Sequence, residues 1–429
     1  MFLRSLSIKD MRSIGDLSID FTQEGKAGQL VTRKQTLLLG QNGTGKSSLL
    51  RAIALLTAGS SALGELLGNA DEWIRNTAKQ CVLEAVLTTK DGEPRPLRLE
   101  LNRGNSLKDV ISNNAESINL LEAALEHAER NYFVVGYGAS RRLNTGENAW
   151  FSQRGTFQSA RANNVSTLFR NDAELNPLTA WAIDLHYQTD STTEGLDIIR
   201  ESLEGLLPGV RFHSINKAKK QLLFESTDGI VPLHLLSDGY QNMTAWIGDL
   251  LYRISSSFHD YKMPLNARGL LLIDEVDLHI HPVWQRHLLN FLKSKLPNFQ
   301  IVATTHSPLT AQQAAEGELY SLQRSAATDN VELVPFYGDP QKMLLHQLML
   351  SDAFGVETDE SLVAVERKNA YRALRNKPKL SPSERKKMRE LSDDIRVLPT
   401  AADYPNALVS KEQMVLMNEL AKELSKKGI

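Results

Sequence analysis

Residues 40–47 read GQNGTGKS and constrain the fold more than any other stretch, because they match the phosphate-binding pattern G-x-x-x-x-G-K-[ST] in full. The apolar run QTLLLG leads into this motif and the amphipathic pattern SSLLRAIALLTAG follows it, which predicts a strand before the motif and a helix after it. Gly40, Gly43 and Gly45 allow the backbone to curl until successive N–H groups face phosphate oxygens. The sequence therefore predicts a strand, loop and helix that bind the phosphates of a nucleotide.

The polar residues of this loop have expected roles at a nucleotide. Lys46 would reach the β- and γ-phosphates, and Ser47 would ligate Mg²⁺. We therefore predict ATP and Mg²⁺ as cofactors, the alternative being a glycine-rich turn that matches the pattern by chance. The residues expected to contact the nucleotide are Gln41, Asn42, Gly43, Thr44, Gly45, Lys46, Ser47 and Ser48.

A second motif, LLLIDE at 270–275, is a buried-strand pattern that ends in two carboxylates. Asp274 is expected to ligate Mg²⁺ together with Ser47, and Glu275 is expected to act as the general base that polarises a water. Alone, this pattern could be an ordinary strand terminus. Paired with the phosphate-binding loop, it predicts the metal-binding and catalytic half of a nucleotide site.

His306 follows a third strand pattern, QIVATT, and precedes Ser307 and Pro308, which are typical of a helix N-cap and a first helical residue. A polar residue directly after a parallel strand lies where ligands bind in open α/β sheets. His306 is therefore a second catalytic candidate, and the alternative is a solvent-exposed loop histidine.

The segment LLSDGYQN at 235–242 has two interpretations. Ser or Asp before a helix caps free backbone N–H groups and Gly permits the bend, so the segment could be an ordinary helix start. A Ser–Gly turn at a helix start is also an anion site. The phosphate-binding loop before it and the carboxylate strand after it favour the anion site.

The order GQNGTGKS, LLSDGYQ, LLLIDE, ATTH resembles that of the ABC-type ATPases. The second of these motifs, LLSDGYQ, contains SDG where the commoner form of the signature reads LSGGQ. This SDG version is similar to the cytosolic OLD-like or AAA_21 branch. Four further stretches also resemble that branch: IKDMRSIGDLSIDF, GYGASRR, LNPLTAWAIDL and DEVDLHIHPVWQ. The chain looks like the ATPase subunits of anti-phage systems of the Septu type (PtuA-like), which act with a separate HNH nuclease.

This resemblance implies contacts between two subunits. In ABC-type ATPases the signature segment, here Ser237, Asp238 and Gly239, contacts the γ-phosphate held by the other subunit's phosphate-binding loop. It therefore implies a homodimer or a higher homo-oligomer. Arg12 resembles an early arginine that touches nucleotide phosphates, with a surface ion pair as the alternative.

Two features depart from the family pattern or have an open meaning. The glutamine that usually senses Mg²⁺ has no clear counterpart, and GYGASRR, with Ser140 and Arg141, occupies its place in the order. His279 and His281 form an H-x-H pair that could suggest a metal site. Without carboxylate partners, we expect instead the loop that touches the partner subunit.

The formal charge of −2 excludes a global positive field for DNA or an anionic membrane, so nucleic-acid contact would need a local patch. One candidate patch contains aromatic residues and arginines between Arg141 and Arg170, with a solvated helical lobe as the alternative. A single cysteine, Cys81, excludes an internal disulfide. No apolar run reaches the roughly 18 residues that span a bilayer, and the first residues lack an apolar signal core. We expect a cytoplasmic protein without a membrane partner.

The predicted fold class is α/β, a P-loop NTPase of ABC type with a mixed sheet core, a β lobe, an inserted helical lobe and a C-terminal helical region. The ATPase domain is expected over 1–340. Within it, we expect a β-rich lobe with the phosphate-binding loop at 1–105 and a helical lobe with the signature segment at 106–250. The part with the two carboxylates and His306 is expected at 251–340. A helical docking or oligomerisation region is expected over 341–429.

Three functions fit these patterns. The first is an ATP-hydrolysing switch that dimerises head-to-tail around ATP and regulates an effector, an HNH nuclease in anti-phage defence. The second is a DNA-repair ATPase, RecF-like or Rad50-like, which would contact nucleic acid itself. The third is a scaffold that nucleotide stabilises and in which hydrolysis is incidental.

Overall fold

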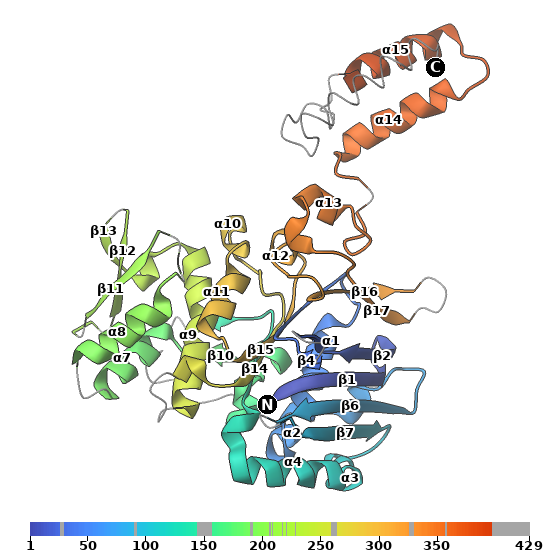
Figure 1. Cartoon of the computed structure of the whole chain (residues 1–429). Helices are drawn as coiled ribbons and strands as arrows, with labels where there is room; N and C mark the ends of the chain where they lie inside the picture. The colour runs from blue at the N-terminus through green and yellow to red at the C-terminus, as the bar shows by residue number, and fades with distance from the viewer. Residues whose placement is uncertain are drawn as a thin grey trace. The chain divides into compact units, whose positions relative to one another are not determined.

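The structure is a computed structural model of the whole chain. It describes residues 1–396, apart from 26–29, 90–91, 144–156, 189–191, 206, 208, 217, 220, 228, 259–263, 326–329 and 357. The chain forms two compact units, Met1–Val356 and a second unit that follows Val356 (Figure 1).

The first unit is built around a six-stranded sheet with the order β17-β16-β5-β15-β14-β8. The strands from β16 to β8 are parallel, and β17 pairs antiparallel with β16. The strands β5, β14 and β15 are buried on both faces, which explains their continuous apolar sequences. The bounds are β5 (Gln35–Gly40), β8 (Val134–Tyr137), β14 (Gly269–Ile273), β15 (Phe299–Thr304), β16 (Leu319–Arg324) and β17 (Val331–Pro335).

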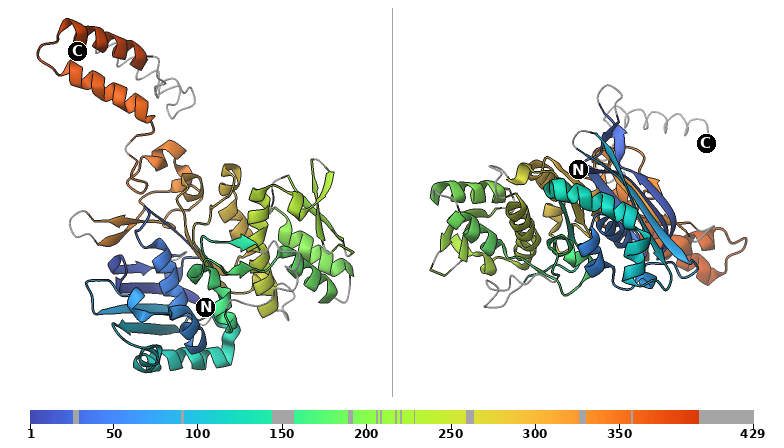
Figure 2. Two further views of the ribbon diagram at one scale, coloured as in Figure 1. Left: turned by 180° about the vertical axis from the view of Figure 1, so that it is seen from behind. Right: turned by 90° about the horizontal axis from the view of Figure 1, so that it is seen from below.

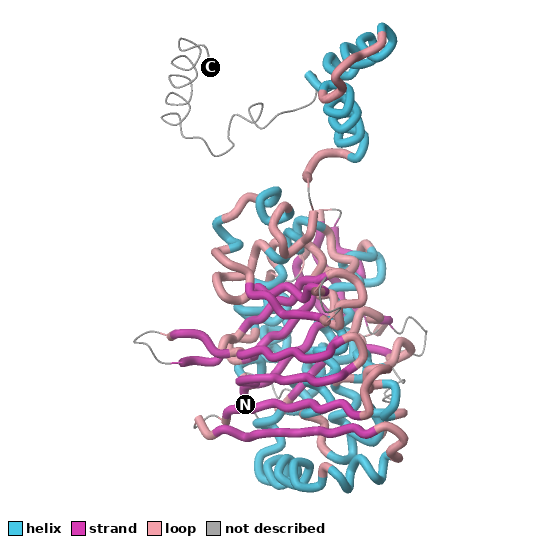
Figure 3. The backbone as a smooth tube through the Cα atoms, turned by 90° about the vertical axis from the view of Figure 1, so that its right-hand side faces the viewer, coloured by secondary structure: helices cyan, strands magenta, loops and turns pink. Residues whose placement is uncertain are grey.

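A second sheet forms the β lobe, with the antiparallel order β2-β1-β6-β7 (Figure 3). Its strands are β1 (Phe2–Met11), β2 (Ile14–Asp20), β6 (Gln80–Thr88) and β7 (Pro94–Asn102). Residues 2–20 and 80–102 thus each form an antiparallel strand pair. Cys81 lies buried in β6, and this burial raises the pKa of its thiol to about 12.

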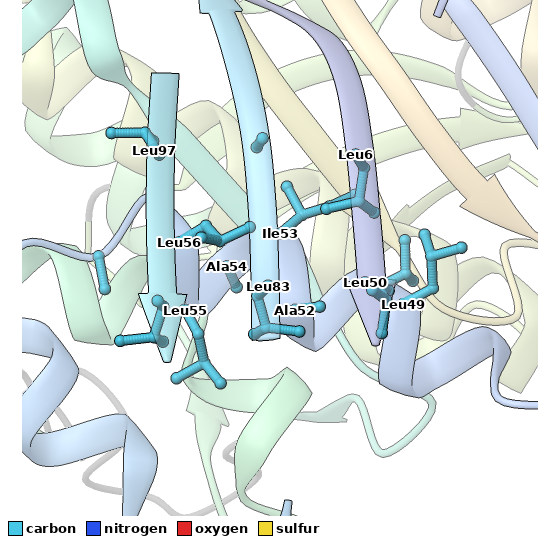
Figure 4. Close-up of a cluster of buried hydrophobic side chains, with 14 of the residues drawn as sticks. Leu6, Leu49, Leu50, Ala52, Ile53, Ala54, Leu55, Leu56, Leu83 and Leu97 are labelled. Carbon is cyan, nitrogen blue, oxygen red and sulfur yellow. The ribbon is translucent and has the colours of Figure 1, made fainter. Parts of the chain in front are cut away.

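Helix α1 (Lys46–Leu56) packs between the two sheets. Figure 4 shows its apolar side chains beside Leu6, Leu83 and Leu97 of the β lobe. Leu50 and Ile53 are fully buried in this core. The amphipathic pattern after the phosphate-binding loop thus places the helix start at the sheet edge and its apolar face under the β lobe.

One buried amide joins the β lobe to the central sheet. Gln300 in β15 accepts a hydrogen bond from Leu3 N at 2.6 Å and donates to Leu3 O at 2.9 Å and to Arg33 O at 3.3 Å. The amide therefore satisfies the N–H and the carbonyl oxygen of Leu3, and this joins β1 to the central sheet.

The other face of the central sheet carries the second core. Residues alternate between the faces, so Leu270 and Leu272 join the core under the β lobe while Leu271 and Ile273 join the second core. That second core contains α7 (Leu178–Gln188), α8 (Thr192–Leu203), α9 (Asp238–Ser257) and a three-stranded sheet of β11 (Arg211–Asn216), β12 (Gln221–Ser226) and β13 (Gly229–Pro232).

Two helices of the predicted helical segment 106–250 pack on the β lobe and not on the second core. Helices α3 (Leu107–Asn113) and α4 (Ala115–Ala128) pack against β7 of the β lobe. With its mixed sheet, β lobe, inserted helices and C-terminal helices, the chain has the predicted α/β fold class. In the described part, no helix is both long enough and apolar enough to cross a bilayer.

The second unit contains a hairpin of α14 (Leu362–Arg375) and α15 (Pro382–Arg396), drawn in orange and red in Figure 2. Ser361 caps α14, and Ser381 caps α15 by accepting from Glu384 N at 3.3 Å. Two helices therefore lie within the region 341–429 that was expected to be helical. Residues 397–429 of the predicted C-terminal region lie outside the described residues.

Candidate functional site

Four of the segments singled out in the sequence lie at the carboxyl ends of four adjacent parallel strands. The phosphate-binding loop follows β5, Asp274 follows β14, and Thr305 and His306 follow β15, which lies between the other two. The segment GYGASRR continues from β8 on the far side of β14. The strand order therefore brings together groups that are up to about 265 residues apart in the chain, which parallel pairing alone produces.

The phosphate-binding loop has the backbone that its glycines predict. Gly40, Gly43 and Gly45 have positive φ angles of 149°, 81° and 92°. A Cβ on Gly40 would lie 2.6 Å from the carbonyl oxygen of Leu322, and one on Gly45 would lie 2.9 Å from Ile14. Both positions therefore require glycine for conformation and for space.

Lys46 lies buried beneath this loop. Its Nζ donates to the carbonyl oxygens of Gly40 at 2.7 Å and Gln41 at 3.0 Å. Burial lowers the pKa of Lys46, while Asp274 and Glu275 act in the opposite direction. The ammonium group is thus within electrostatic reach of both carboxylates. Around it, Thr44 and Ser48 are buried, Ser47 is half-buried, and Gln41, Asn42 and Gly43 are exposed.

Arg12 lies in the turn between β1 and β2, and that turn packs on the loop. A Cβ on Gly45 would also lie 3.1 Å from Ser13 Oγ. Arg12 stacks over Trp73 with its Cζ 4.1 Å from the ring centroid, and its Nε donates to Glu72 O at 3.1 Å. Burial and then Arg51 lower its pKa. The guanidinium is therefore held by its stacking on Trp73 and its hydrogen bond to Glu72 O, in a turn whose next residue, Ser13, lies close to Gly45.

The carboxylate motif is held by Thr304 at the end of β15. Thr304 Oγ1 donates to Asp274 Oδ1 at 2.7 Å and accepts from Glu275 N at 2.7 Å. Glu275 has a φ of 47°, the left-handed region that a residue with a side chain rarely occupies. One hydroxyl thus orients the carboxylate of the expected metal ligand and the backbone of the expected general base.

Arg141 is the functional candidate that the sequence did not assign to this site. Its guanidinium donates to the main-chain oxygens of Asp274 and, at 2.7 Å, of Glu275, and its Nε donates to Gly138 O at 3.0 Å. Burial lowers the pKa of Arg141 to about 10. It therefore remains charged at neutral pH and fixes the main chain on the side opposite Thr304. The only sequence signal was its place in the segment GYGASRR.

His306 is exposed at the end of β15, as the alternative interpretation expected, yet it lies among the charges of the site. Burial of part of the ring and then Lys46 lower its pKa, while Glu275, Asp277 and Asp274 oppose the shift. Asp277 accepts a hydrogen bond from Thr305 Oγ1 and its pKa is raised by burial. Ser307 and Pro308 form the predicted cap and first residue of α12 (Pro308–Ala311).

The signature segment lies at the start of α9. Ser237 is the exposed N-cap, and its hydroxyl makes no capping hydrogen bond, while the helix begins at Asp238, whose side chain lies outside the described residues. Ser237 and Gly239 line a cavity of about 350 Å³ against α10 (Pro282–Gln285). The hydroxyl is thus not used as an ordinary helix cap, which leaves the anion-site interpretation of LLSDGYQN in place.

A buried polar network connects this helix to the strand before Arg141. Asp249 in α9 is fully buried and accepts from Tyr137 Oη at 2.8 Å, from Arg253 Nε at 2.6 Å and from both nitrogens of Asn176. Tyr137 ends β8, and its carbonyl oxygen accepts from Asp274 N at 2.7 Å. Arg141 lies 5.4 Å from the ring centroid of Trp246 in α9. The signature helix α9 is therefore connected to the carboxylate motif after β14 in two ways, through Tyr137 and through Arg141.

The structure also describes the surroundings of the H-x-H pair and of the basic stretch. Among the described residues, no group of three or more His, Cys, Asp or Glu could hold a metal ion, and His281 caps α10. The arginines of the basic stretch make internal contacts where they are described: Arg161 donates to Thr57, Ala58 and Tyr132 oxygens, and Arg170 pairs with Asp172. Trp150, Phe151 and Arg154 lie outside the described residues. The described arginines of this stretch therefore include one inward-facing donor, Arg161, and one exposed ion-pair member, Arg170.

The chain belongs to the AAA_21 family. The family model, described as "AAA domain, putative AbiEii toxin, Type IV TA system", matches residues 36–311. The family predicted from the motifs is therefore confirmed.

Curated relatives belong to two named systems. The chain is 25% identical over 319 residues to the Septu protein PtuA of Bacillus mycoides, covering 74% of this chain and 40% of that one. It is 30% identical over 126 residues to the Retron Ec83 probable ATPase of Escherichia coli, covering 29% and 23%. The chain thus spans less than half the length of these relatives.

Among solved structures, the chain is similar to an SMC head bound to the C-terminal winged-helix domain of ScpA, with 15% identity and a TM-score of 0.46 over 78% of this chain and 98% of that one. The SMC head domain of Thermotoga maritima gives a TM-score of 0.43 at 14% identity.

We expect Asp249→Asn to destabilise the first unit by about 3–5 kcal/mol, because an amide cannot accept from all these donors and leaves the buried Arg253 without its counter-charge. The matched control is Asp197→Asn, whose partner Arg200 lies on a solvent-exposed helix face, and we expect a change below about 1 kcal/mol. Urea unfolding of the full chain measures both. Equal effects of the two substitutions would contradict a structural role for the network.

Proposed function

We propose that the chain is a cytoplasmic ATP-hydrolysing switch that dimerises head-to-tail around ATP and regulates an effector in anti-phage defence. One observation carries the hydrolytic part: Lys46 beneath the glycine loop lies within electrostatic reach of Asp274 and Glu275 at the end of β14. A phosphate cradle and a carboxylate pair at one sheet edge are the parts that phosphoryl transfer to water needs.

The residues fit Mg²⁺ and the phosphates of ATP. The hydroxyl of Ser47 and the carboxylate of Asp274 are hard oxygen donors of the kind Mg²⁺ takes, and Thr304 donates to one carboxylate oxygen of Asp274. Bound Mg²⁺ would supply charge neutralisation at the phosphates. The main-chain N–H groups of the loop bind phosphate oxygens, and Lys46 exchanges its carbonyl contacts for the phosphates.

In this proposal, Glu275 accepts a proton from the attacking water and His306 contacts the γ-phosphate. The backbone of Glu275 is left-handed, and hydrogen bonds from its N–H to Thr304 and from Arg141 to its carbonyl oxygen hold that conformation. Without nucleotide, the pKa of His306 is lowered by burial, which favours the neutral ring. A neutral imidazole can donate to the phosphate without competing with Lys46 for its charge.

The dimer is supported by the free hydroxyl of the exposed Ser237 at the start of α9. A 20-residue helix presents backbone N–H groups and a partial positive charge at this end. We infer that the γ-phosphate bound by one protomer meets Ser237 and Gly239 of the other. Two sites would then form in each dimer, and hydrolysis would separate the protomers.

The effector is proposed to be an HNH nuclease. The support is similarity to the proteins named Septu protein PtuA and to a retron ATPase, together with the resemblance to ATPase subunits that act with such a nuclease. The C-terminal region after 341 is the proposed docking or oligomerisation surface.

Glu275→Gln should retain ATP binding and reduce hydrolysis by about 10²-fold or more, because an amide cannot accept the water's proton. We expect ATP to accumulate a dimer of this variant, measured by light scattering with ATP, with ADP and without nucleotide. Glu316→Gln, at an exposed glutamate, is the control and should behave as the parent chain. An oligomer that forms equally in all three states would support the scaffold instead.

Ser237→Arg should leave nucleotide affinity largely intact and abolish hydrolysis, because the bulky cation blocks the contact with the partner's γ-phosphate. Ser256→Arg, at the exposed far end of the same helix, is the matched control for charge and helix stability. Fluorescent-nucleotide titration and phosphate release measure the two properties. Normal turnover in the Ser237 variant would return LLSDGYQN to a simple helix cap.

Arg141→Ala should lower kcat by about 10²-fold, a loss typical of a misplaced catalytic group, with little change in KM, because the phosphate-binding loop is untouched. Arg141→Lys retains the charge and should recover part of the rate. Arg170→Ala, whose partner is the exposed Asp172, is the control. A rise in KM at constant kcat would show that Arg141 acts on binding and not on the position of Glu275.

A further inference from the structure

The two helices of the second unit end in a strongly basic tip. We define the basic tip as residues 372–389, the last turn of α14, the connecting loop and the first two turns of α15. It contains one acidic residue, Glu384, and eight basic residues, all exposed: Arg372, Arg375, Lys377, Lys379, Arg385, Lys386, Lys387 and Arg389.

This charge contrasts with the rest of the chain. The whole chain has 49 basic and 51 acidic residues, so outside the tip 41 basic residues face 50 acidic ones. The residues outside the tip therefore carry a net negative charge that repels a polyanion, while the tip carries a net positive charge that attracts one. The charge separation localises any polyanion contact to this end of the hairpin.

The single acidic residue of the tip, Glu384, makes contacts within the tip. Glu384 pairs with Lys377 at 2.5 Å and accepts from Ser381 N at 2.8 Å. These contacts, first that with Lys377, lower the pKa of Glu384 to about 2. Among the described residues of the tip, the structure shows one ion pair, between Lys377 and Glu384. The other seven basic side chains are exposed to solvent.

The shape of the tip is fixed. Two prolines, Pro378 and Pro382, restrict the connecting loop, and the half-buried Leu374, Leu380 and Met388 lie at the same end of the hairpin. The cations thus project from a preorganised support, which lowers the entropy lost when they bind.

We infer that the basic tip binds the phosphate backbone of nucleic acid. A duplex carries one negative charge per roughly 1.7 Å of axis, so a tip whose two helix axes lie about 10 Å apart spans on the order of six phosphates. The tip exposes no large apolar side chain of the kind that anchors protein interfaces. The exposed apolar residues of α14, Leu362 and Val363, lie at its other end, 80% and 57% exposed.

The contact is sequence-independent. Arginine and lysine on the ends of two helices reach backbone oxygens. Two helices side by side, each about 10–12 Å across with its side chains, are too wide for a major groove about 12 Å across. The surface therefore positions the protein on nucleic acid without selecting a sequence. This inference rests on the second unit alone and does not depend on ATP hydrolysis.

The test uses the full chain and labelled nucleic acid at several salt concentrations, without nucleotide. Arg385→Ala/Lys386→Ala/Lys387→Ala should weaken binding to a short duplex by about tenfold or more and reduce the slope of log K against log salt by about 2 to 3. The matched control, Lys9→Ala/Lys79→Ala/Lys108→Ala, removes three exposed charges from the first unit and should leave both quantities unchanged.

Three further measurements distinguish nucleic acid from other polyanions as the ligand of the tip. Duplex DNA and single-stranded RNA should both bind and both lose affinity in the tip variant. Equal loss in the control variant would show a diffuse charge effect and overturn the inference. Poly-L-glutamate that competes as strongly as DNA would assign the tip to an acidic protein instead. Glu275→Gln should bind DNA as the parent chain does, which keeps this result independent of the proposed hydrolysis.

Discussion

The backbone at Glu275 is held in a left-handed conformation between two neighbours, and the geometry of the site depends on it. A residue with a side chain loses about 1–2 kcal/mol in this region of φ. Thr304 on one side and Arg141 on the other supply hydrogen bonds that offset this strain. Strain of this kind at a strand end is typical of functional sites, because the surrounding structure has to over-determine the conformation.

The same constraint joins the site to the signature helix. Arg141 contacts the carboxylate strand and lies over Trp246 of α9, and Tyr137 joins β8 to Asp249 of the same helix. A shift of α9 would have to break or carry these buried contacts, since an uncompensated buried charge costs several kcal/mol. The proposed engagement of Ser237 by a partner's nucleotide would thus be felt at Glu275 through packed side chains that the structure describes.

Charge is distributed between the two units in a way that matches separate tasks. The site in the first unit concentrates a few buried charges at one sheet edge, where a low dielectric strengthens their interactions. The second unit carries its cations on exposed helix ends, where they act over a Debye length and respond to salt. The first arrangement suits chemistry on a phosphate, and the second suits attachment to a polyanion.

Local sequence determined the strands, the glycine loop, the helix after it and the motif residues Lys46, Asp274 and His306, because each depends on periodicity, glycine conformation or position at a strand end. It also determined the family, through the order of those motifs. Sequence could not assign Arg141, because its role depends on β8 lying next to β14. Nor could it separate the arginines of one basic stretch into buried donors and surface charges.

Only the tertiary structure decided which side chains meet. It turned Arg161 inward onto carbonyl oxygens, left Ser237 without a capping contact and placed Thr304 between Asp274 and the main chain of Glu275. The physical reason is that pairing between strands distant in sequence selects neighbours by sheet order, which no local pattern encodes.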